Sequence, residues 1–137
     1  MKLKLSFLFA ISCIYSWSQT TTQTFDASGT FTVPAGVTSL SVQAWGGGGS
    51  GGGARPTYLL VVGAGAGGGG GAYASSSISV TPGAVLNIVV ASAKAGILLA
   101  NGVNGDNSTI TGFETSILAA GGSGGIGYLA GVEILPV

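Results

Sequence analysis

Short stretches in which apolar and polar residues alternate follow one another along the chain. Residues 30–33 (TFTV), 40–45 (LSVQAW) and 78–80 (ISV) place apolar side chains at every second position. This period of two is typical of β-strands that bury one face. Residues 84–91 (AVLNIVVA) are almost wholly apolar, which is typical of a strand buried on both faces. No segment shows helical periodicity over eleven residues, so the pattern predicts an all-β protein.

Turn signals separate the predicted strands. Residues 34–36 (Pro-Ala-Gly) follow the first strand, and residues 81–83 (Thr-Pro-Gly) follow a later one. The second segment predicts a type II turn, in which proline and then glycine occupy the central positions. Residues 107–111 and 115–120 are expected to form the last hairpin.

Glycine is concentrated in three tracts, residues 46–53, 63–71 and 121–127, each of which directly leaves or enters a predicted strand. The tracts could be flexible linkers, since glycine loses the most backbone entropy on ordering. They could instead be packed polyproline-II-like helices, in which glycine lets two backbones approach closely enough to hydrogen-bond. We favour packing because the tracts are about 25 Å long, which matches the span of a domain, and contain little Ser or Thr.

The composition excludes several classes of function. The 137 residues include 27 glycines, one cysteine and no histidine, and only 6% are charged. Zinc sites, Ser-His-Asp triads and His-based acids or bases are therefore excluded. Four Lys/Arg against four Asp/Glu provide no basic surface for nucleic acid or anionic lipid. No cofactor is expected.

Residues 1–18 predict a signal peptide. Two lysines near the start precede the apolar residues 5–15, and Ser-Trp-Ser then supplies small residues for a signal peptidase. Cleavage between Ser18 and Gln19 would leave residues 19–137 as a mature glycine-rich β domain, secreted or at the cell surface. The apolar run is shorter than the ~20 residues of a membrane-spanning helix, so no transmembrane segment is expected in the mature chain.

A lipid anchor is the alternative to plain secretion. Cys13 follows Ala-Ile-Ser and could become a lipidated N-terminal residue. Ala10 stands three positions before Cys13, where a lipoprotein signal has leucine, so secretion without a lipid is favoured.

Five short motifs occur in an order that resembles a recurring glycine-rich domain. They are Phe31-Thr-Val-Pro-Ala-Gly-Val37, Ala44-Trp45-Gly46-Gly47-Gly48, Gly70-Gly71-Ala72-Tyr73-Ala74, Val80-Thr81-Pro82-Gly83 and Asn104-Gly105-Asp106-Asn107-Ser108. The order is similar to that in secreted proteins of Bacteroidetes (flavobacteria) and in glycine-rich modules of phage tail fibres and adhesins. It resembles more distantly the glycine-rich region of the anaplastic lymphoma kinase ectodomain. The resemblance covers nearly all of residues 24–127.

The resemblance implies a small jelly-roll-like β-sandwich with polyglycine helices packed on it, in a structural or adhesive protein without catalysis. Bulky apolar residues at 55–62 and 97–100 stand where the family has mostly Gly, Ala, Ser and Asn. Residues 127–137 abandon the glycine-rich composition. This change leaves a truncated or frame-shifted gene product without independent function as an alternative.

The glycines of residues 63–68 (GAGAGG) have the spacing of a dinucleotide-binding fingerprint. That fingerprint needs a helix at its third glycine and an acidic residue about 20 positions later. Three further glycines follow at 69–71 instead, and residues 80–92 contain neither Asp nor Glu. No nucleotide is therefore expected to bind.

Residues 101–107 (NGVNGDN) have the oxygen-rich composition of a calcium loop. Calcium takes about six to eight oxygen ligands, usually including several carboxylates, and Asp106 is the one acidic residue in this segment. Asn-Gly pairs are also frequent in turns, so a turn is favoured and no metal is expected. The Asn107-Ser-Thr sequon is interpreted as the end of that turn and the start of a strand.

Three carboxylates could formally act as a glycosidase pair: Asp26 with Glu114 or with Glu133. Such pairs stand about 5–9 Å apart, and one member has a raised pKa. The three residues are far apart in the sequence, and none of them has a neighbouring arginine. Catalysis is therefore not expected.

Trp45, Tyr58, Tyr73 and Tyr128 are the candidates for contact with a ligand or partner. Aromatic rings at the rim of a glycine-rich surface can stack on sugars or pack on a protein. Trp45 could instead cap the hydrophobic core, and we favour that interpretation because tryptophans are highly buried on average. The sequence thus predicts a secreted, non-enzymatic structural or adhesive domain whose partner is a protein or glycan at the cell surface. A small binding module that uses the aromatic rim is the alternative.

Overall fold

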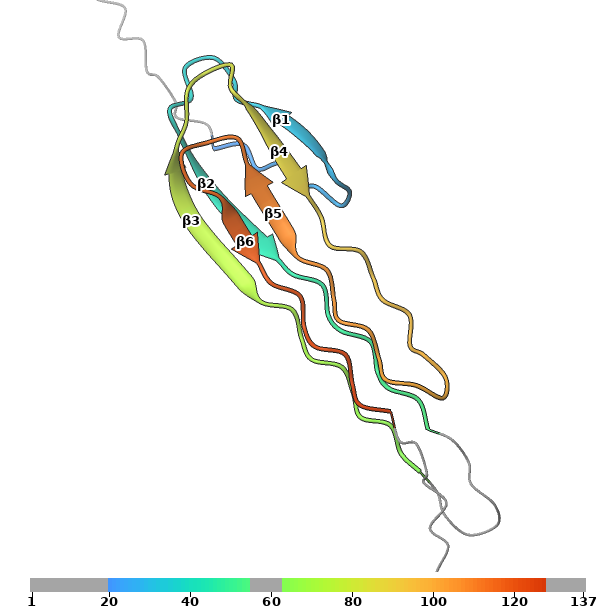
Figure 1. The fold of residues 1–137 in the computed structure, drawn as a ribbon. Coiled ribbons are helices and arrows are strands. Elements are labelled where there is room, and N and C mark those ends of the chain that lie inside the picture. Colours follow the sequence, from blue (N-terminus) through green and yellow to red (C-terminus); the bar gives the residue numbers. More distant parts are fainter. Residues whose placement is uncertain (1–19, 55–62, 128–137) are drawn as a thin grey trace, which may run out of the picture.

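The structure, a computed structural model, describes residues 20–54 and 63–127. In this part of the chain it contains β-strands and no helix, as the sequence predicts. The strands are β1 (Gly29–Thr32), β2 (Ser39–Trp45), β3 (Tyr73–Ser79), β4 (Val85–Val89), β5 (Ser108–Thr111) and β6 (Ile117–Ala119) (Figure 1). None of the described residues forms a helix that is long and apolar enough to cross a membrane.

The strands form two antiparallel sheets. One has four strands in the order β1-β4-β5-β6, and the other is the pair β2-β3. The core lies between the sheets, since it joins Leu86, Ile117 and Ala119 of the first sheet to Ala44 and Ile78 of the second. The alternating pattern of β2 therefore has the predicted outcome: Leu40, Val42 and Ala44 face the core, and their neighbours face solvent.

Two of the predicted turns are confirmed, and glycine has a conformational role in each. Gly36 and Gly83 both have positive φ, at 81° and 83°, in the left-handed region that glycine enters without a steric penalty. Ala84 N donates to the Thr81 carbonyl at 3.0 Å, which closes the turn before β4. The predicted last hairpin is also present, as the antiparallel pair β5-β6.

The prediction that residues 84–91 are buried on both faces is wrong. Leu86 is 2% exposed, but Val85 and Val89 on the opposite face of β4 are 50% and 49% exposed. Their cross-strand partners are Thr32 and Thr109, so valine and threonine together form an outer face. β-branched residues favour strands even where one face is exposed. Because residues 84–91 contain many of them, the segment has the composition of a strand buried on both faces although one face is exposed.

Four extended tracts continue from the strands away from the sheets and run side by side (Figure 1). The first tract, residues 46–53, follows β2, and the second, residues 63–72, precedes β3. The third, residues 100–107, precedes β5, and the fourth, residues 120–127, follows β6. Three of them correspond to the glycine tracts of the sequence, and the third was not predicted to be one.

The first tract is hydrogen-bonded to the second and the third with a repeat of three residues. Its N–H groups donate to carbonyl oxygens of the second tract, from Gly46 to Ala72, from Gly49 to Gly69 and from Gly52 to Ala66, at 2.8–2.9 Å. Its bonds to the third run from Gly47 to Asp106, Ser50 to Val103 and Gly53 to Ala100, also at 2.8–2.9 Å. A polyproline II helix has three residues per turn and no internal hydrogen bonds, so the observed repeat matches that geometry.

The fourth tract closes the arrangement. Its carbonyl oxygens accept hydrogen bonds from N–H groups of the second tract: Ala66 donates to Ile126, Gly69 to Ser123 and Ala72 to Ala120, at 2.7–2.8 Å. It accepts from the third at Gly102 to Gly125 and Gly105 to Gly122, both 2.7 Å. It donates to the first at Gly122 to Gly47 and Gly125 to Ser50, both 2.8 Å. The first and fourth tracts are therefore each bonded to the other three. The predicted packing of the tracts is present, and they are not free linkers.

Close approach, and not a special φ, explains the glycines inside this bundle. No glycine within residues 46–53, 65–72, 100–107 and 120–127 has a positive φ. At many tract glycines, a Cβ atom would lie closer than 3.0 Å to the backbone of a neighbouring tract, a separation that real Cβ atoms essentially never show. On the first three tracts these positions recur every third residue: Gly46, Gly49 and Gly52 on the first, Gly65, Gly68 and Gly71 on the second, and Gly102 and Gly105 on the third. On the fourth tract they are Gly121, Gly122, Gly124, Gly125 and Gly127, which meet the backbone of the second and third tracts. By contrast, Gly67 and Gly70 have nothing within 4 Å of such an atom.

The turn predicted within residues 101–107 is wrong. These residues form the extended third tract, and the turn lies earlier, at Leu98 and Leu99. Leu99 has a φ of 66°, although Asn and Gly would enter that region more readily. The Asn-Gly pairs serve the packing of the tract instead, because the glycines face the first tract and the asparagines bond to the fourth.

Candidate functional site

Two of the four aromatic candidates form an exposed pair where the sheet meets the glycine tracts. Trp45 ends β2, Tyr73 begins β3, and the two are direct cross-strand partners. Their ring centroids are 5.3 Å apart with an angle of 47° between the ring planes. Trp45 is 62% exposed and Tyr73 is 54% exposed. The pair therefore presents aromatic surface to solvent.

The interpretation that Trp45 caps the core is wrong. In β2 the core-facing side chains are those of Leu40, Val42 and Ala44, and Trp45 lies on the other face because side chains alternate along a strand. Only the backbone of Trp45 is held in the interior: its carbonyl accepts a 2.7 Å hydrogen bond from the Ser108 hydroxyl, which is 6% exposed. The average burial of tryptophan predicts a buried Trp45, whereas the alternation along β2 correctly places its side chain on the solvent side.

The rest of the outer β2-β3 face is polar and uncharged. Next to the aromatic pair stand the cross-strand partners Gln43 and Ser75, and then Ser41 and Ser77. All four are exposed. This face therefore combines two rings, an amide and hydroxyl groups on one pair of strands.

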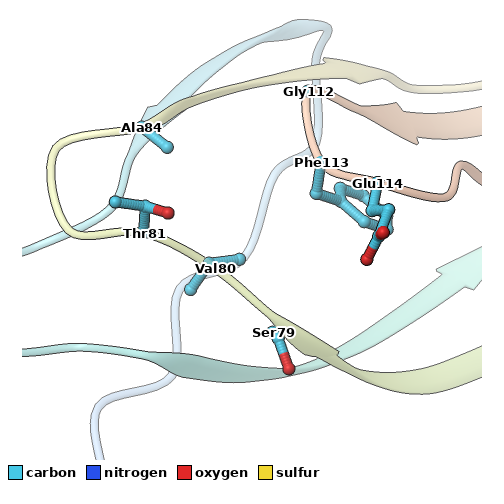
Figure 2. A pocket seen from close by; sticks show the side chains of 7 residues that line it. All are labelled: Ser79, Val80, Thr81, Ala84, Gly112, Phe113 and Glu114. Carbon is cyan, nitrogen blue, oxygen red and sulfur yellow. The ribbon is translucent and has the colours of Figure 1, made fainter.

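A second candidate is a pocket of about 300 Å³ at the far end of the sheets from the glycine tracts. Figure 2 shows its lining, which comes from the end of β3, the turn before β4 and the β5-β6 connection. Val80 and Phe113 supply apolar surface, and Ser79, Thr81 and Glu114 supply oxygen atoms. In the figure the carboxylate of Glu114 lies at one edge of the group.

Asp106 is engaged within the protein. Its Oδ2 atom is 2.7 Å from Lys94 Nζ and accepts a 2.5 Å hydrogen bond from the Ser92 hydroxyl. The hydrogen bonds from Lys94 and Ser92 lower the pKa of Asp106 below its usual 3.8. Within residues 20–54 and 63–127, no group of three or more His, Cys, Asp or Glu side chains could hold a metal ion. The Asp106 carboxylate therefore joins the third tract to Ser92 and Lys94 in the segment between β4 and that tract.

The glycines with dinucleotide-like spacing belong to the second tract. Gly65 and Gly68 face the backbone of the first tract, and the second tract leads directly into β3. A pyrophosphate-binding fingerprint needs a helix at this point, and a strand follows instead.

Several sequence-based candidates lie outside the described residues. These are the signal peptide with the Ser18–Gln19 cleavage site and Cys13, the aromatic candidates Tyr58 and Tyr128, and Glu133. Of the three carboxylates considered as a glycosidase pair, Glu114 lines the pocket and Asp26 precedes β1. Nothing in the described structure brings those two together.

The order of strands and glycine tracts agrees with a comparison against known protein families. The family described as glycine-rich domain matches residues 20–134, most of the chain. The chain belongs to this family. Comparison with curated proteins and with solved structures finds no match. The family assignment for this glycine-rich domain therefore agrees with the predicted resemblance at the level of the domain.

Sequence reasoning missed one set of residues in the glycine-rich domain. The side-chain Oδ1 atoms of Asn101, Asn104 and Asn107 accept hydrogen bonds from the N–H groups of Gly127, Gly124 and Gly121, each at 2.8 Å. The signal was visible: asparagine recurs every third residue, which is the period of a polyproline II helix. A period of three beside the glycine tracts would have identified the third tract.

Proposed function

We propose that this chain is a secreted, non-enzymatic domain that acts in the structure or adhesion of the cell surface. The observation that supports this proposal most is the bundle of four tracts, bonded to one another at steps of three residues. Because the backbones are in contact at their glycines, the bundle has little room to deform. It would act as a stiff extension of the β-sheets, which we propose form a jelly-roll-like sandwich.

Export of the chain is part of the proposal. The features of residues 1–18 and the resemblance to secreted proteins of Bacteroidetes support removal of the leader before Gln19. A non-enzymatic role is supported by the sequence, which holds no histidine and one cysteine, at position 13. Within the described residues the tracts are joined by backbone hydrogen bonds, by three asparagine side chains and by the Ser50 hydroxyl.

A second candidate function is a small secreted module that binds a carbohydrate or a protein. The exposure of Trp45 and Tyr73 as a contacting pair favours it. Large exposed aromatic residues are enriched where proteins bind partners. This function is compatible with the first, because an adhesive protein needs a contact surface as well as a rigid support.

Localisation and attachment together test the proposal. The gene would be expressed in a host that exports it, and intact-mass analysis would determine the N-terminus. Protease treatment of intact cells would then report surface exposure, and a flow-chamber assay would count attached cells with and without the gene. We expect an N-terminus at Gln19, cleavage by external protease, and more attached cells. Retention of Met1 inside the cell, or unchanged attachment by a surface-exposed chain, would contradict the proposal.

Two glycine variants test whether cell attachment depends on the packing of the four tracts. Gly49→Ala places a Cβ against the Ser123 carbonyl, whereas at Gly48 the nearest atom is 3.6 Å away, an ordinary contact distance. Cells that display Gly48→Ala should attach like the parent, and cells that display Gly49→Ala should not. Equal attachment by both variants would show that the packed tracts do not contribute to adhesion.

A further inference from the structure

The outer face of β2-β3 differs in chemistry from the outer face of the four-stranded sheet. The four-stranded sheet exposes Val85, Val89 and Leu118, at 50%, 49% and 54%. The β2-β3 face exposes Trp45 and Tyr73 at one end and then polar side chains along both strands. The two faces are therefore suited to different ligands.

The register places the polar and aromatic groups in successive rows. Trp45 stands opposite Tyr73, Gln43 opposite Ser75, and Ser41 opposite Ser77. Same-face residues repeat about every 6.6–6.8 Å along a strand, and cross-strand partners stand about 5 Å apart. The three rows make a strip about 13 Å long that begins with the ring pair.

No residue of this strip is charged. Each serine hydroxyl both donates and accepts a hydrogen bond, and the Gln43 amide offers two donors and an acceptor. The hydroxyl groups of a sugar also both donate and accept. An anionic ligand would find no cation in the strip, and neutral hydroxyl and amide groups cost less to desolvate than charges.

The ring pair adds an apolar contact for a sugar ring. The C–H face of a pyranose is apolar, and the rings of Trp45 and Tyr73, with centroids 5.3 Å apart, together present an apolar surface for it. Protein hot spots gather in well-packed, fully desolvated pockets, whereas this strip is an exposed face of two strands. One pocket, lined by Val80 and Phe113, lies at the other end of the sheets, so the exposed and uncharged strip favours a glycan.

We propose that the strip formed by Trp45, Tyr73, Gln43, Ser75, Ser41 and Ser77 binds a neutral polysaccharide chain that lies along β2-β3. The rings would stack on one sugar unit, and the amide and hydroxyls would hydrogen-bond to the units that follow. This assignment rests on the second candidate function and names its ligand class. It gives the stiff domain an adhesive surface for uncharged glycans.

Affinity electrophoresis of the purified protein tests the ligand class. Native gels would contain one of three neutral polysaccharides (a soluble β-glucan, a galactomannan or a mannan) or the anionic alginate. We expect retardation by at least one neutral polysaccharide and none by alginate. Trp45→Ala and Tyr73→Ala should each weaken the binding about tenfold or more, as loss of a central aromatic contact does. Trp45→Phe should restore most of the affinity.

Leu118→Ala is the matched control, because Leu118 is also an exposed large residue but lies on the other sheet. It should bind like the parent, and the urea midpoints of all variants should stay close to that of the parent. Absence of retardation by every neutral polysaccharide, or retardation that survives Trp45→Ala, would overturn the proposal. Sedimentation that shows a dimer lost in Trp45→Ala would assign the face to a second copy of the chain instead. Any of these results would leave the export and attachment tests of the structural role unaffected.

Discussion

The Oδ1 atom of Asn104 accepts a 2.8 Å hydrogen bond from the backbone N–H of Gly124. The same contact joins Asn107 to Gly121 and Asn101 to Gly127, so the third and fourth tracts are connected at steps of three residues. A polyproline II helix makes no internal hydrogen bonds, and its amide groups therefore need partners on neighbouring segments or in water. The asparagine side chains supply three of these partners.

We expect Asn104→Ala to lower the free energy of unfolding by about 1 kcal/mol, the net contribution of one hydrogen bond. The Gly124 amide should also exchange its hydrogen faster, while the Gly121 amide keeps its rate. Urea denaturation and hydrogen exchange measure the two effects. Asn104→Asp is the matched control, since a carboxylate oxygen can accept the same bond. If Asn104→Ala and Asn104→Asp behave alike, the hydrogen bond does not stabilise the bundle.

The sequence was sufficient to predict the strands and the three glycine-rich tracts, because both depend on short periodic patterns. The third tract could not be predicted from glycine content, since only Gly102 and Gly105 lie between its asparagines. Its conformation depends on partners far away in the sequence: Gly105 bonds to Gly122 and Gly102 to Gly125. Asn-Gly pairs favour turns locally, and here the packing between tracts overrides that preference.

The ion pair of Lys94 and Asp106 predicts a change of stability in acid. Because Lys94 and Ser92 lower the pKa of Asp106, the folded state favours the ionised carboxylate. The resulting stability is present above the usual pKa of 3.8 and is lost as the pH falls through the lowered pKa. Lys94→Met should therefore be less stable than the parent at neutral pH, and the difference should shrink at about pH 2.

Urea midpoints of the parent and Lys94→Met across this pH range measure the effect. Added salt should also reduce the difference at neutral pH, since both groups are partly exposed and the pair is screened. If the urea midpoints of the parent and Lys94→Met differ as much at about pH 2 as at neutral pH, the ion pair does not cause the difference in stability.

The positive φ of Leu99 predicts a stabilising substitution. A bulky residue in the left-handed region costs about 1–2 kcal/mol, and glycine is free of that cost. We therefore expect Leu99→Gly to be more stable than Leu98→Gly by about 1 kcal/mol. Leu98 is the matched control because it is the neighbouring residue of the same turn, is 88% exposed and does not have a positive φ. Thermal unfolding of the two variants compares them. Equal midpoints would indicate that Leu99 is not strained.

The candidate site was only partly predictable. Trp45 and Tyr73 were identified as aromatic candidates, but their contact depends on the register of β2 with β3. A short turn would set that register, and here residues 46–72 separate the two strands. The same register brings Gln43 and the serines into the strip beside them. Serine and glutamine on an exposed face are common in any soluble protein, so only their position next to the ring pair makes them candidates.

The central claim is that the glycines allow the tracts to pack and do not make them flexible. Gly48 and Gly49 are neighbours in the first tract, and neither has a positive φ. A Cβ at Gly49 would meet the Ser123 carbonyl, whereas at Gly48 the nearest atom is the Gly69 oxygen at 3.6 Å. Alanine at either position restricts the unfolded chain equally, so the difference between the two variants reports packing alone.

The most direct measurement is the urea midpoint of Gly49→Ala against that of Gly48→Ala. Packed tracts predict that Gly49→Ala loses about 3 kcal/mol or more, at the upper end of overpacking effects. They predict that Gly48→Ala matches the parent or exceeds it by about 0.4–1 kcal/mol. If both variants are as stable as the parent or more stable, the tracts are flexible linkers and the account is contradicted.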